Sequence, residues 1–258
     1  MSESVLFPKI FIGTLESGES EFSQCKAAIA GQKGVTIFHH VVSGLSEFEA
    51  HNALWTEWNR VKEGYQLFVK IDADTVLIGD DALLRIWTVF STDARVSGAQ
   101  VFLHDHFSDG LIAGLNAFTP VVKFTPSKSR LNADHADSNH TKIFKPKDLM
   151  HLAPIGLHAP SPGDDQSLFY GYHRALKEQT ELLAQVVAAY QSKPNRSRRL
   201  ALLGAFIAKI RTRGIYRWFP RAPLSKKALA LSAKRIESKK NFGRILDEFI
   251  SNFPRPNP

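Results

Sequence analysis

Two carboxylates, Asp72 and Asp74, stand one residue apart where an apolar run over residues 67–71 ends. The run is typical of a buried strand. Carboxylate oxygens held at the end of a rigid strand are hard ligands of the kind that Mg²⁺ or Mn²⁺ prefers. A divalent ion bound there would neutralise a diphosphate. The pair also fits an ordinary turn, because two aspartates spaced by one arise by chance in many chains.

Alternating strand and helix patterns position this pair. Strand patterns cover residues 9–12, 35–38, 65–71 and 97–103, and helical patterns lie between them at residues 22–30, 46–61 and 82–90. Ser46 with Glu49 forms a capping box, and Asp80 or Asp81 is expected to cap the third helix. This order predicts right-handed crossovers and an α/β fold with a mainly parallel sheet.

The carboxyl ends of parallel strands are where such sheets bind ligands. Asp72 and Asp74 follow the third strand, while Glu16 and His39-His40 follow the first two. We therefore expect these side chains to face one crevice. Further along the chain, residues 107–162 give a weak pattern, and residues 170–190 are expected to form one long helix.

Charge divides the chain. Residues 1–192 hold 16 Lys and Arg against 22 Asp and Glu, a net −6, whereas residues 193–258 hold 17 against 3, a net +14. We therefore expect a main domain over residues 1–192 and a basic, mostly helical extension over residues 193–258. A single Cys25, no evident signal peptide and no apolar run of about 20 residues lead us to expect a soluble, cytoplasmic protein.

Two enzyme classes use an aspartate pair in this setting. The run from Asp72 to Val76 resembles the first motif of haloacid-dehalogenase-like phosphatases, which would make Asp72 a nucleophile. In those enzymes the nucleophile strand normally opens the core domain, but here two strand–helix units precede it. The later acidic pair of that class should follow an apolar strand, and Asp164-Asp165 follow a proline-rich loop. The phosphatase is therefore kept as the alternative.

Residues 9–177 resemble a nucleotide-diphospho-sugar glycosyltransferase of the GT-A fold, near family 2. The resemblance is carried by Asp72-Ala73-Asp74 after two strand–helix units and by Asp164-Asp165 before a later helix. It implies a nucleotide-diphosphate sugar donor, an ion of Mn²⁺ or Mg²⁺, and a glycan or lipid-linked acceptor. The sequence departs from the family where residues 38–43 replace an acidic loop, and where Asp-Asp stands for the commoner Glu-Asp.

The resemblance also implies roles for individual residues. Asp74 would be the direct metal ligand, Asp72 would contact metal or ribose, and His158 is a candidate third ligand. The nucleotide-sugar side would be completed by Thr14, Glu16 and Lys70. Asp165, with Asp164 as the fallback, would be the base that takes the acceptor proton, which implies inversion; the alternative role is helix capping. Asp105 and Asp109 are candidates for binding donor sugar or acceptor.

The basic extension has three interpretations. Residues 195–240 could lie on an anionic membrane, with Trp218 and Phe219 at the interface and residues 200–207 partly inserted. Basic side chains interleaved with aromatic ones also occur in nucleic-acid-binding proteins, although nucleic acid is the least favoured partner. The third interpretation is a helical appendage with a charged outer face. A transferase acting on a lipid-linked glycan would work at the inner face of the cell membrane, and a basic interaction protein is the non-enzymatic alternative.

Overall fold

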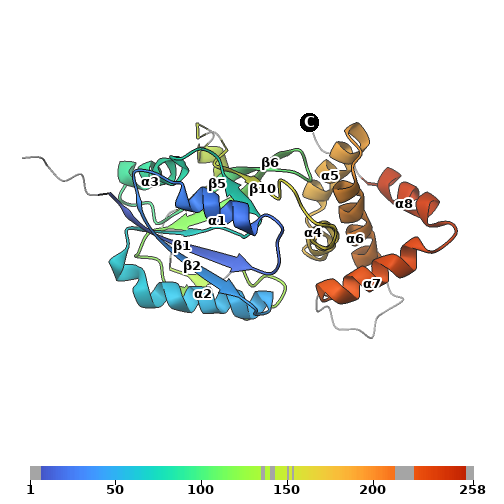
Figure 1. Cartoon of the computed structure of the whole chain (residues 1–258), viewed down its shortest axis with the longest axis horizontal. Coiled ribbons are helices and arrows are strands. Elements are labelled where there is room, and N and C mark those ends of the chain that lie inside the picture. Colours follow the sequence, from blue (N-terminus) through green and yellow to red (C-terminus); the bar gives the residue numbers. More distant parts are fainter. Residues whose placement is uncertain are drawn as a thin grey trace, which may run out of the picture. The chain divides into compact units, whose positions relative to one another are not determined.

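The chain forms two compact units (Figure 1). The computed structural model describes residues 7–134, 137–139, 143–149, 151–152, 154–212 and 224–253. Unit 1 consists of residues 1–104 and 111–160, and unit 2 consists of residues 105–110 and 161–258. By packing, residues 161–192 therefore belong with the helices that follow them. The expected functional boundary at residue 192 stays a prediction.

Unit 1 is built on one eight-stranded sheet in the order β2-β1-β3-β6-β5-β10-β4, with β9 beside β5. Its strands are β1 (Lys9–Glu16), β2 (Thr36–Ser43), β3 (Leu67–Lys70), β4 (Thr75–Leu77), β5 (Gly98–Asp105), β6 (Gly110–Phe118), β9 (Ile143–Phe144) and β10 (Gly156–His158). A second small sheet pairs β7 (Phe124–Thr125) with β8 (Asp137–Ser138). β1 runs parallel to both β2 and β3, whereas β3–β6 and β4–β10 are antiparallel. The predicted α/β fold is confirmed; β1, β2 and β3 run parallel to one another, and β5 runs parallel to β9.

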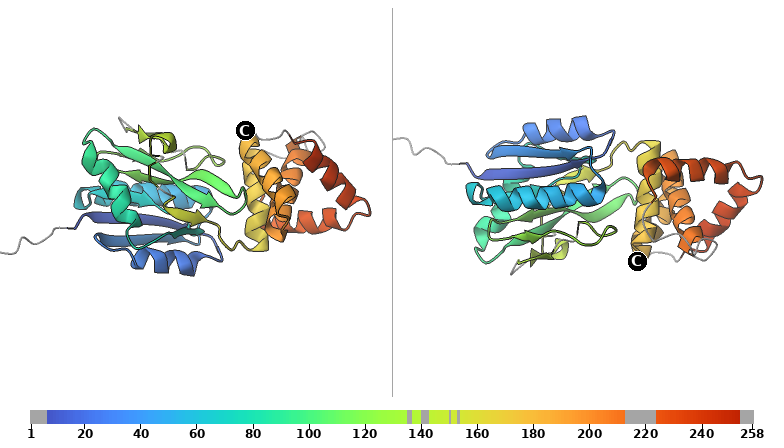
Figure 2. Two further views of the ribbon diagram at one scale, coloured as in Figure 1. Left: turned by 90° about the horizontal axis from the view of Figure 1, so that it is seen from above. Right: turned by 90° about the horizontal axis from the view of Figure 1, so that it is seen from below.

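Helices cover both faces of this sheet. α2 (Glu47–Val61) lies on one face, and α1 (Phe22–Ala30) and α3 (Ala82–Thr92) lie on the other (Figures 1 and 2). Short 3₁₀ helices occupy Lys62–Gly64 and Pro146–Leu149. The predicted capping box at Ser46 and Glu49 is confirmed. Asp81 occupies the N-cap position of α3 as expected, but its side chain makes no capping hydrogen bond. It lies 3.3 Å from Arg85, and Asp80 pairs with Lys33 at 2.7 Å.

An aromatic core fixes α2 against the sheet. Trp55 and Trp58 of α2 and Phe68 of β3 are all buried, and the rings of Trp58 and Phe68 stack with centroids 5.0 Å apart. Each buried aromatic side chain contributes about 2–3 kcal/mol to stability. Since Phe68 lies two residues before Lys70, this packing also fixes the strand end from which Asp72 and Asp74 project.

Unit 2 is helical, with α4 (Asp164–Leu176), α5 (Thr180–Ser192), α6 (Arg196–Thr212), α7 (Lys226–Glu237) and α8 (Phe242–Ser251). The single long helix expected over residues 170–190 is wrong. The chain leaves helical geometry after Leu176, and Glu178 takes a positive φ of 56° that ends α4 before α5 begins. None of the helices in the described ranges is long and apolar enough to cross a membrane.

α6 is the central helix of unit 2. A side chain at Gly171 of α4 would place its Cβ 1.7 Å from the backbone oxygen of Ala201, and one at Gly204 of α6 would come within 2.0 Å of the Leu168 oxygen. The two helix backbones therefore touch, and only glycine fits at either position. The apolar residues of α6, from Leu200 to Ile207, are almost all buried. The expected insertion of residues 200–207 into a membrane is therefore wrong.

The turn at residues 105–110 is held in unit 2 by a buried arginine. Arg198 of α6 is 3% exposed and donates hydrogen bonds to the carbonyl oxygens of His106 at 2.9 Å and Phe107 at 3.2 Å. It also donates to the Lys193 carbonyl at 3.0 Å and lies 3.5 Å from an Asp109 carboxylate oxygen. This network explains why a turn between two strands of the sheet packs with the helices.

Candidate functional site

Three parallel strand ends meet at the aspartate pair. In the strand register, Gly13 of β1 lies opposite His40 of β2 and opposite Lys70 of β3. The Ile71 amide then donates to the Gly13 carbonyl at 3.0 Å, which extends the pairing by one residue. Asp72 and Asp74 follow directly, at the sheet edge where α/β folds bind ligands.

The turn that carries the two aspartates is fixed from both sides. The Thr75 amide donates to the Asp72 carbonyl at 2.9 Å, which closes the turn. The Ala159 amide donates to the Asp74 carbonyl at 2.8 Å, and Thr75 of β4 pairs with His158 of β10. A strand about 80 residues later in the chain therefore supports the turn and brings His158 beside it.

Asp72 forms an ion pair with the lysine two residues before it. Lys70 Nζ lies 2.5 Å from Asp72 Oδ1, and the two side chains are 9% and 47% exposed. Partial burial raises the pKa of the Asp72 carboxyl, but the attraction and hydrogen bond of Lys70 outweigh this, so its pKa lies below the ordinary value. The same pair keeps the pKa of Lys70 raised despite burial. Asp72 is thus an ionised carboxylate with an internal counter-ion.

Asp74 lies in a different setting, beside the imidazole of His158. Asp74 Oδ2 and His158 Nε2 are 3.5 Å apart, and the side chains are only 18% and 12% exposed. Burial raises the pKa of the Asp74 carboxyl, the negative charges of Asp72, Glu19 and Glu21 add to this, and His158 opposes it. Negative charge is therefore concentrated around Asp74, and a bound cation would relieve it.

This donor set fits a divalent ion that completes its coordination with other ligands. Carboxylate and imidazole together suit Mn²⁺, and carboxylates alone suit Mg²⁺. Because Lys70 occupies one oxygen of Asp72, Asp74 and His158 are the residues that would hold the ion. No three acidic, histidine or cysteine side chains in the described part of the chain are grouped to bind a metal by themselves. The remaining ligands would be water or phosphate oxygens, as is usual for Mg²⁺ bound near nucleotides.

Thr14 and Glu16, which were expected to contact the nucleotide, both make contacts within unit 1. Thr14 is fully buried, and its hydroxyl lies 2.9 Å from His39 Nε2 on the neighbouring strand. Glu16 is partly buried, and its carboxylate accepts from the Gly18 amide at 2.7 Å. Glu16 therefore closes the loop that follows β1. Their expected role in binding a nucleotide stays a prediction.

Two buried residues next to the aspartate pair, His51 and Cys25, were not predicted as site residues. His51 of α2 is 5% exposed; its Nδ1 lies 2.8 Å from the Glu47 carbonyl, and Nε2 has no hydrogen-bond partner among the described residues. Burial, with the nearby charge of Lys70, lowers the pKa of His51 to about 4. The sequence feature that could have revealed the burial of His51 is its position on the apolar face of α2, three residues before Leu54.

Cys25 of α1 is the second unassigned group. It is fully buried, and its Sγ lies 3.8 Å from the Asp72 carbonyl oxygen. Burial raises the pKa of the Cys25 thiol to about 12, and the charges of Asp74 and Asp72 contribute. The thiol is therefore neutral and unreactive at ordinary pH. A single cysteine in a helical pattern does not predict that its side chain lies beside Asp72.

The second aspartate pair lies in unit 2, in the first turn of α4. Asp164 accepts two hydrogen bonds from Arg196, at 2.9 and 2.6 Å, and these lower its pKa. Asp165 is exposed and makes no side-chain hydrogen bond or ion pair within the described residues. Gly163 is the N-cap and receives no side-chain capping bond, so neither aspartate caps the helix. Their expected role as base stays a prediction.

Asp105 and Asp109 also belong to unit 2. Asp105 is fully buried and accepts hydrogen bonds from the Ser108 amide and hydroxyl, both at 2.7 Å, and from the Tyr170 hydroxyl at 3.4 Å. Asp109 is exposed and lies beside Arg198. These contacts fix the turn at residues 105–110, and the expected sugar-binding role of both residues stays a prediction. Trp218 and Phe219 lie outside the described residues.

Three solved structures resemble this chain at low sequence identity. The sequence matches no protein-family model and no curated protein. Among solved structures, a mannosyltransferase of Pyrobaculum calidifontis in complex with GDP-Man and Mn²⁺ is 11% identical, with a TM-score of 0.43 over 95% of this chain and 86% of the other. A glycosyltransferase involved in glycosylating the major capsid of PBCV-1 is 13% identical, with a TM-score of 0.32 over 43% of this chain and 60% of the other.

A protein from STIV is 8% identical, with a TM-score of 0.34 over 43% of this chain and 64% of the other. The chain thus covers less than two thirds of the STIV and PBCV-1 proteins. Two of the three neighbours are glycosyltransferases, and the likenesses are too distant to carry an argument about function.

Proposed function

We propose that the chain is a metal-dependent glycosyltransferase that takes its sugar from a nucleotide-diphosphate donor. The observation that carries the proposal is the fixed Asp72–Asp74 turn at the ends of three parallel strands, with His158 3.5 Å from Asp74. Asp74 and His158 can bind a cation, and Lys70, which pairs with Asp72, can attract a diphosphate. The acceptor in this proposal is a glycan or a lipid-linked saccharide.

Each residue has a role that follows from its surroundings. Asp74 and His158 would bind Mn²⁺ or Mg²⁺, and the ion would stabilise the charge that the diphosphate gains as it leaves. Lys70, which Asp72 keeps charged, would add a positive charge close to the phosphates. Asp165 is the preferred base for the acceptor hydroxyl, because Arg196 engages the carboxylate of its neighbour Asp164. The proposal therefore implies inversion at the sugar carbon.

Titration calorimetry on the full chain tests the proposal. Nucleoside diphosphates of the four common bases are titrated with Mn²⁺ present and with EDTA. We expect one of them to bind with Mn²⁺, and the affinity to fall by at least about 100-fold in EDTA and in Asp74→Ala, because loss of a group that only supports a metal ligand already costs about 10–100-fold. Asp80→Ala, which removes an exposed carboxylate of the same unit, is the control and should bind normally.

Two other outcomes would replace the proposal. If no nucleoside diphosphate binds with or without metal, the glycosyltransferase assignment fails. If a small phosphoester such as acetyl phosphate phosphorylates Asp72, detectable by mass spectrometry, the haloacid-dehalogenase-like alternative is correct. A protein that does neither and binds only polyanions would be the non-enzymatic basic interaction protein.

A further inference from the structure

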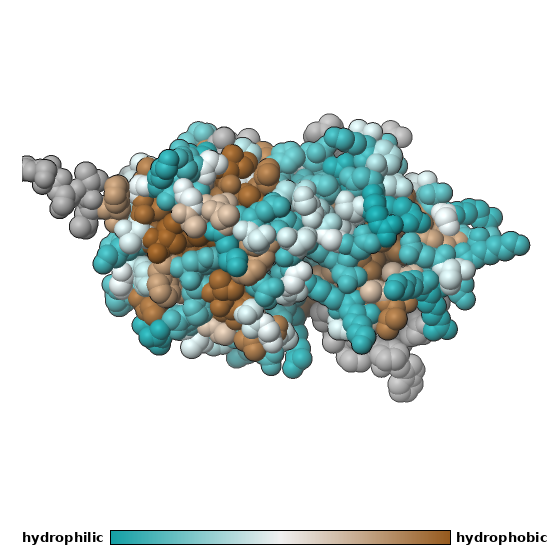
Figure 3. All heavy atoms as spheres, in the orientation of Figure 1, coloured by the Kyte–Doolittle hydropathy of each residue, from teal (hydrophilic) through white to brown (hydrophobic). Residues whose placement is uncertain are grey.

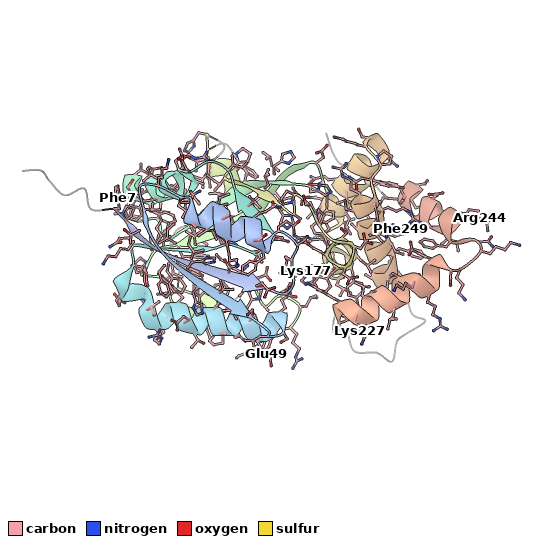
Figure 4. All side chains as sticks on the ribbon, viewed as in Figure 1. Phe7, Glu49, Lys177, Lys227, Arg244 and Phe249 are labelled. Atoms are coloured by element: carbon pink, nitrogen blue, oxygen red, sulfur yellow. The ribbon has the colours of Figure 1, made fainter. Side chains whose placement is uncertain are left out.

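α7, the turn after it and the beginning of α8 carry a group of cations that have no partner among the described residues. We define this basic face by the exposed residues Lys227, Lys234, Arg235, Lys239, Lys240 and Arg244. No hydrogen bond or ion pair joins any of these six side chains to another residue within the described ranges. Figure 4 labels Lys227 on α7 and Arg244 on α8, and Arg244 projects away from the bundle. Six positive charges within 18 residues are thus directed to solvent.

Other arginines of the same unit are engaged. Arg196 binds Asp164, Arg198 binds backbone carbonyls, and Arg199 lies 3.0 Å from Glu237. Residues 224–253 contain seven basic and three acidic residues. One of the acidic residues, Glu237, is already paired with Arg199. The basic face therefore has little internal compensation, and its charge is available to an external partner.

An exposed apolar side chain lies among these cations. Leu231 of α7 is 61% exposed. Leu231 follows Lys227 by four residues and precedes Lys234 by three, so all three share one side of α7. Over α7 and α8 the surface in Figure 3 is mostly hydrophilic, with small hydrophobic areas between. Such a mixture matches the interface of a bilayer, where lysine heads meet lipid phosphates and apolar side chains reach the acyl chains.

We propose that this basic face binds an anionic lipid surface. The six cations complement a negatively charged surface, and the exposed Leu231 among them favours lipid over nucleic acid, because phosphate groups offer an apolar side chain no contact. The surface is narrower than the expected residues 195–240, because the apolar residues of α6 are buried. It keeps the cations from Lys227 to Lys240 and adds Arg244. The inference does not depend on the proposed glycosyltransferase activity, since it rests on α7, α8 and the turn between them.

Vesicle co-sedimentation of the full chain tests the inference. Vesicles of phosphatidylcholine with phosphatidylserine are compared with vesicles of phosphatidylcholine alone. We expect binding only to the anionic vesicles, and weaker binding at high salt. Each Lys near such a surface contributes about fivefold, so the triple variant Lys227→Gln, Lys234→Gln, Lys240→Gln should bind about 100-fold more weakly. Leu231→Gln should weaken binding by about tenfold.

A matched control separates the basic face from net charge. The control is a triple variant that removes three exposed lysines of unit 1, Lys123→Gln, Lys128→Gln and Lys147→Gln. It should bind the vesicles as wild type does. Equal loss in both triple variants, or no binding of the wild-type chain to anionic vesicles, overturns the inference. A DNA duplex that binds more tightly than the vesicles, through the same lysines and independently of Leu231, would identify nucleic acid as the partner. Circular dichroism confirms that each variant is folded.

Discussion

Asp72 and Asp74 in unit 1 and Asp164 and Asp165 in unit 2 are two pairs of the same residue in different surroundings. The first pair ends a buried strand, where one carboxylate has a lysine and the other an imidazole, and their pKa values move in opposite directions. The second pair begins a helix at the surface, where an exposed arginine binds one carboxylate and the other points to solvent. Opposed pKa shifts in one partly buried pair are more typical of functional sites than exposed ion pairs are.

Asp74→Asn should give the largest effect. The amide keeps the size of the side chain but removes its charge, so Mn²⁺-dependent binding of a nucleoside diphosphate should fall by at least about 100-fold. The same substitution should increase the free energy of unfolding at pH 7. The fold raises the pKa of Asp74, so it is more stable when Asp74 is protonated. This stability is present at low pH and is lost as the pH rises through the folded pKa of Asp74.

Urea denaturation in EDTA checks the second half of this prediction. The Asn variant, which mimics protonated Asp74, should be more stable than wild type at pH 7, and the difference should shrink as the pH falls toward 4. A variant that is less stable than wild type at pH 7 would show that the negative charge of Asp74 is compensated in the fold. The difference between the two aspartate pairs would then be smaller than we describe.

Two variants of the second pair, Asp165→Asn and Asp164→Asn, test whether its two carboxylates have different roles. Asp165→Asn should lower kcat by about 100-fold or more if Asp165 is the base, with little change in donor KM. Asp164→Asn removes a carboxylate that Arg196 already engages, so its kcat should change far less. Both constants are measured with the donor that calorimetry identifies. Similar losses in the two variants would mean that the pair acts as a unit and that Arg196 does not separate the roles.

The pH dependence of stability tests whether His51 is buried away from water. The pKa of His51 is about 4 in the fold, below its ordinary value, because burial favours the neutral imidazole. The stability that this burial gives is present above pH 6.5 and is lost as the pH falls toward 4. Between pH 7 and pH 4, the free energy of unfolding should drop by about 3 kcal/mol more in wild type than in His51→Phe. Urea titrations at a series of pH values measure this difference. A parallel decline in both proteins would place His51 in contact with water.

Lys70→Met should give the smallest measurable effect. It removes the counter-ion of Asp72, and because Asp72 is 47% exposed the cost should be about 1–2 kcal/mol, less than for a fully buried pair. Arg196→Gln removes the corresponding partner of Asp164, which is exposed, and should leave the thermal midpoint unchanged. Differential scanning calorimetry compares the two variants. Equal effects would remove the energetic contrast between the pairs.

Local patterns predicted much of unit 1. Ser46 and Glu49 formed the expected capping box because both partners lie within four residues. The position of Asp72 and Asp74 followed from an apolar run that ends in polar residues and from the order of strands before it. The proximity of His158 to Asp74, in contrast, depends on the pairing of β4 with β10 across about 80 residues, which local periodicity does not encode.

Unit 2 was harder to predict, for physical reasons. No glycine or proline marks the break between α4 and α5, which is made by the non-glycine residue Glu178 in a left-handed conformation. The apolar residues of α6 were taken as a membrane surface, yet a helix that is apolar on all sides is as well suited to the centre of a bundle. Arg198 was counted among the basic residues of the tail, although backbone carbonyls and the Asp109 carboxylate satisfy it inside the unit.

The turn at residues 105–110 has a consequence for how such a protein can change. Because this turn packs with the helices, the chain passes from one unit to the other three times, after residues 104, 110 and 160. Exchanging residues 161–258 as one segment would leave behind the turn that packs with the helices. Cutting the chain after residue 160 would leave His106 and Phe107 without Arg198. A substitution in the turn and one at Arg198 are therefore coupled, although about 90 residues separate them in the sequence.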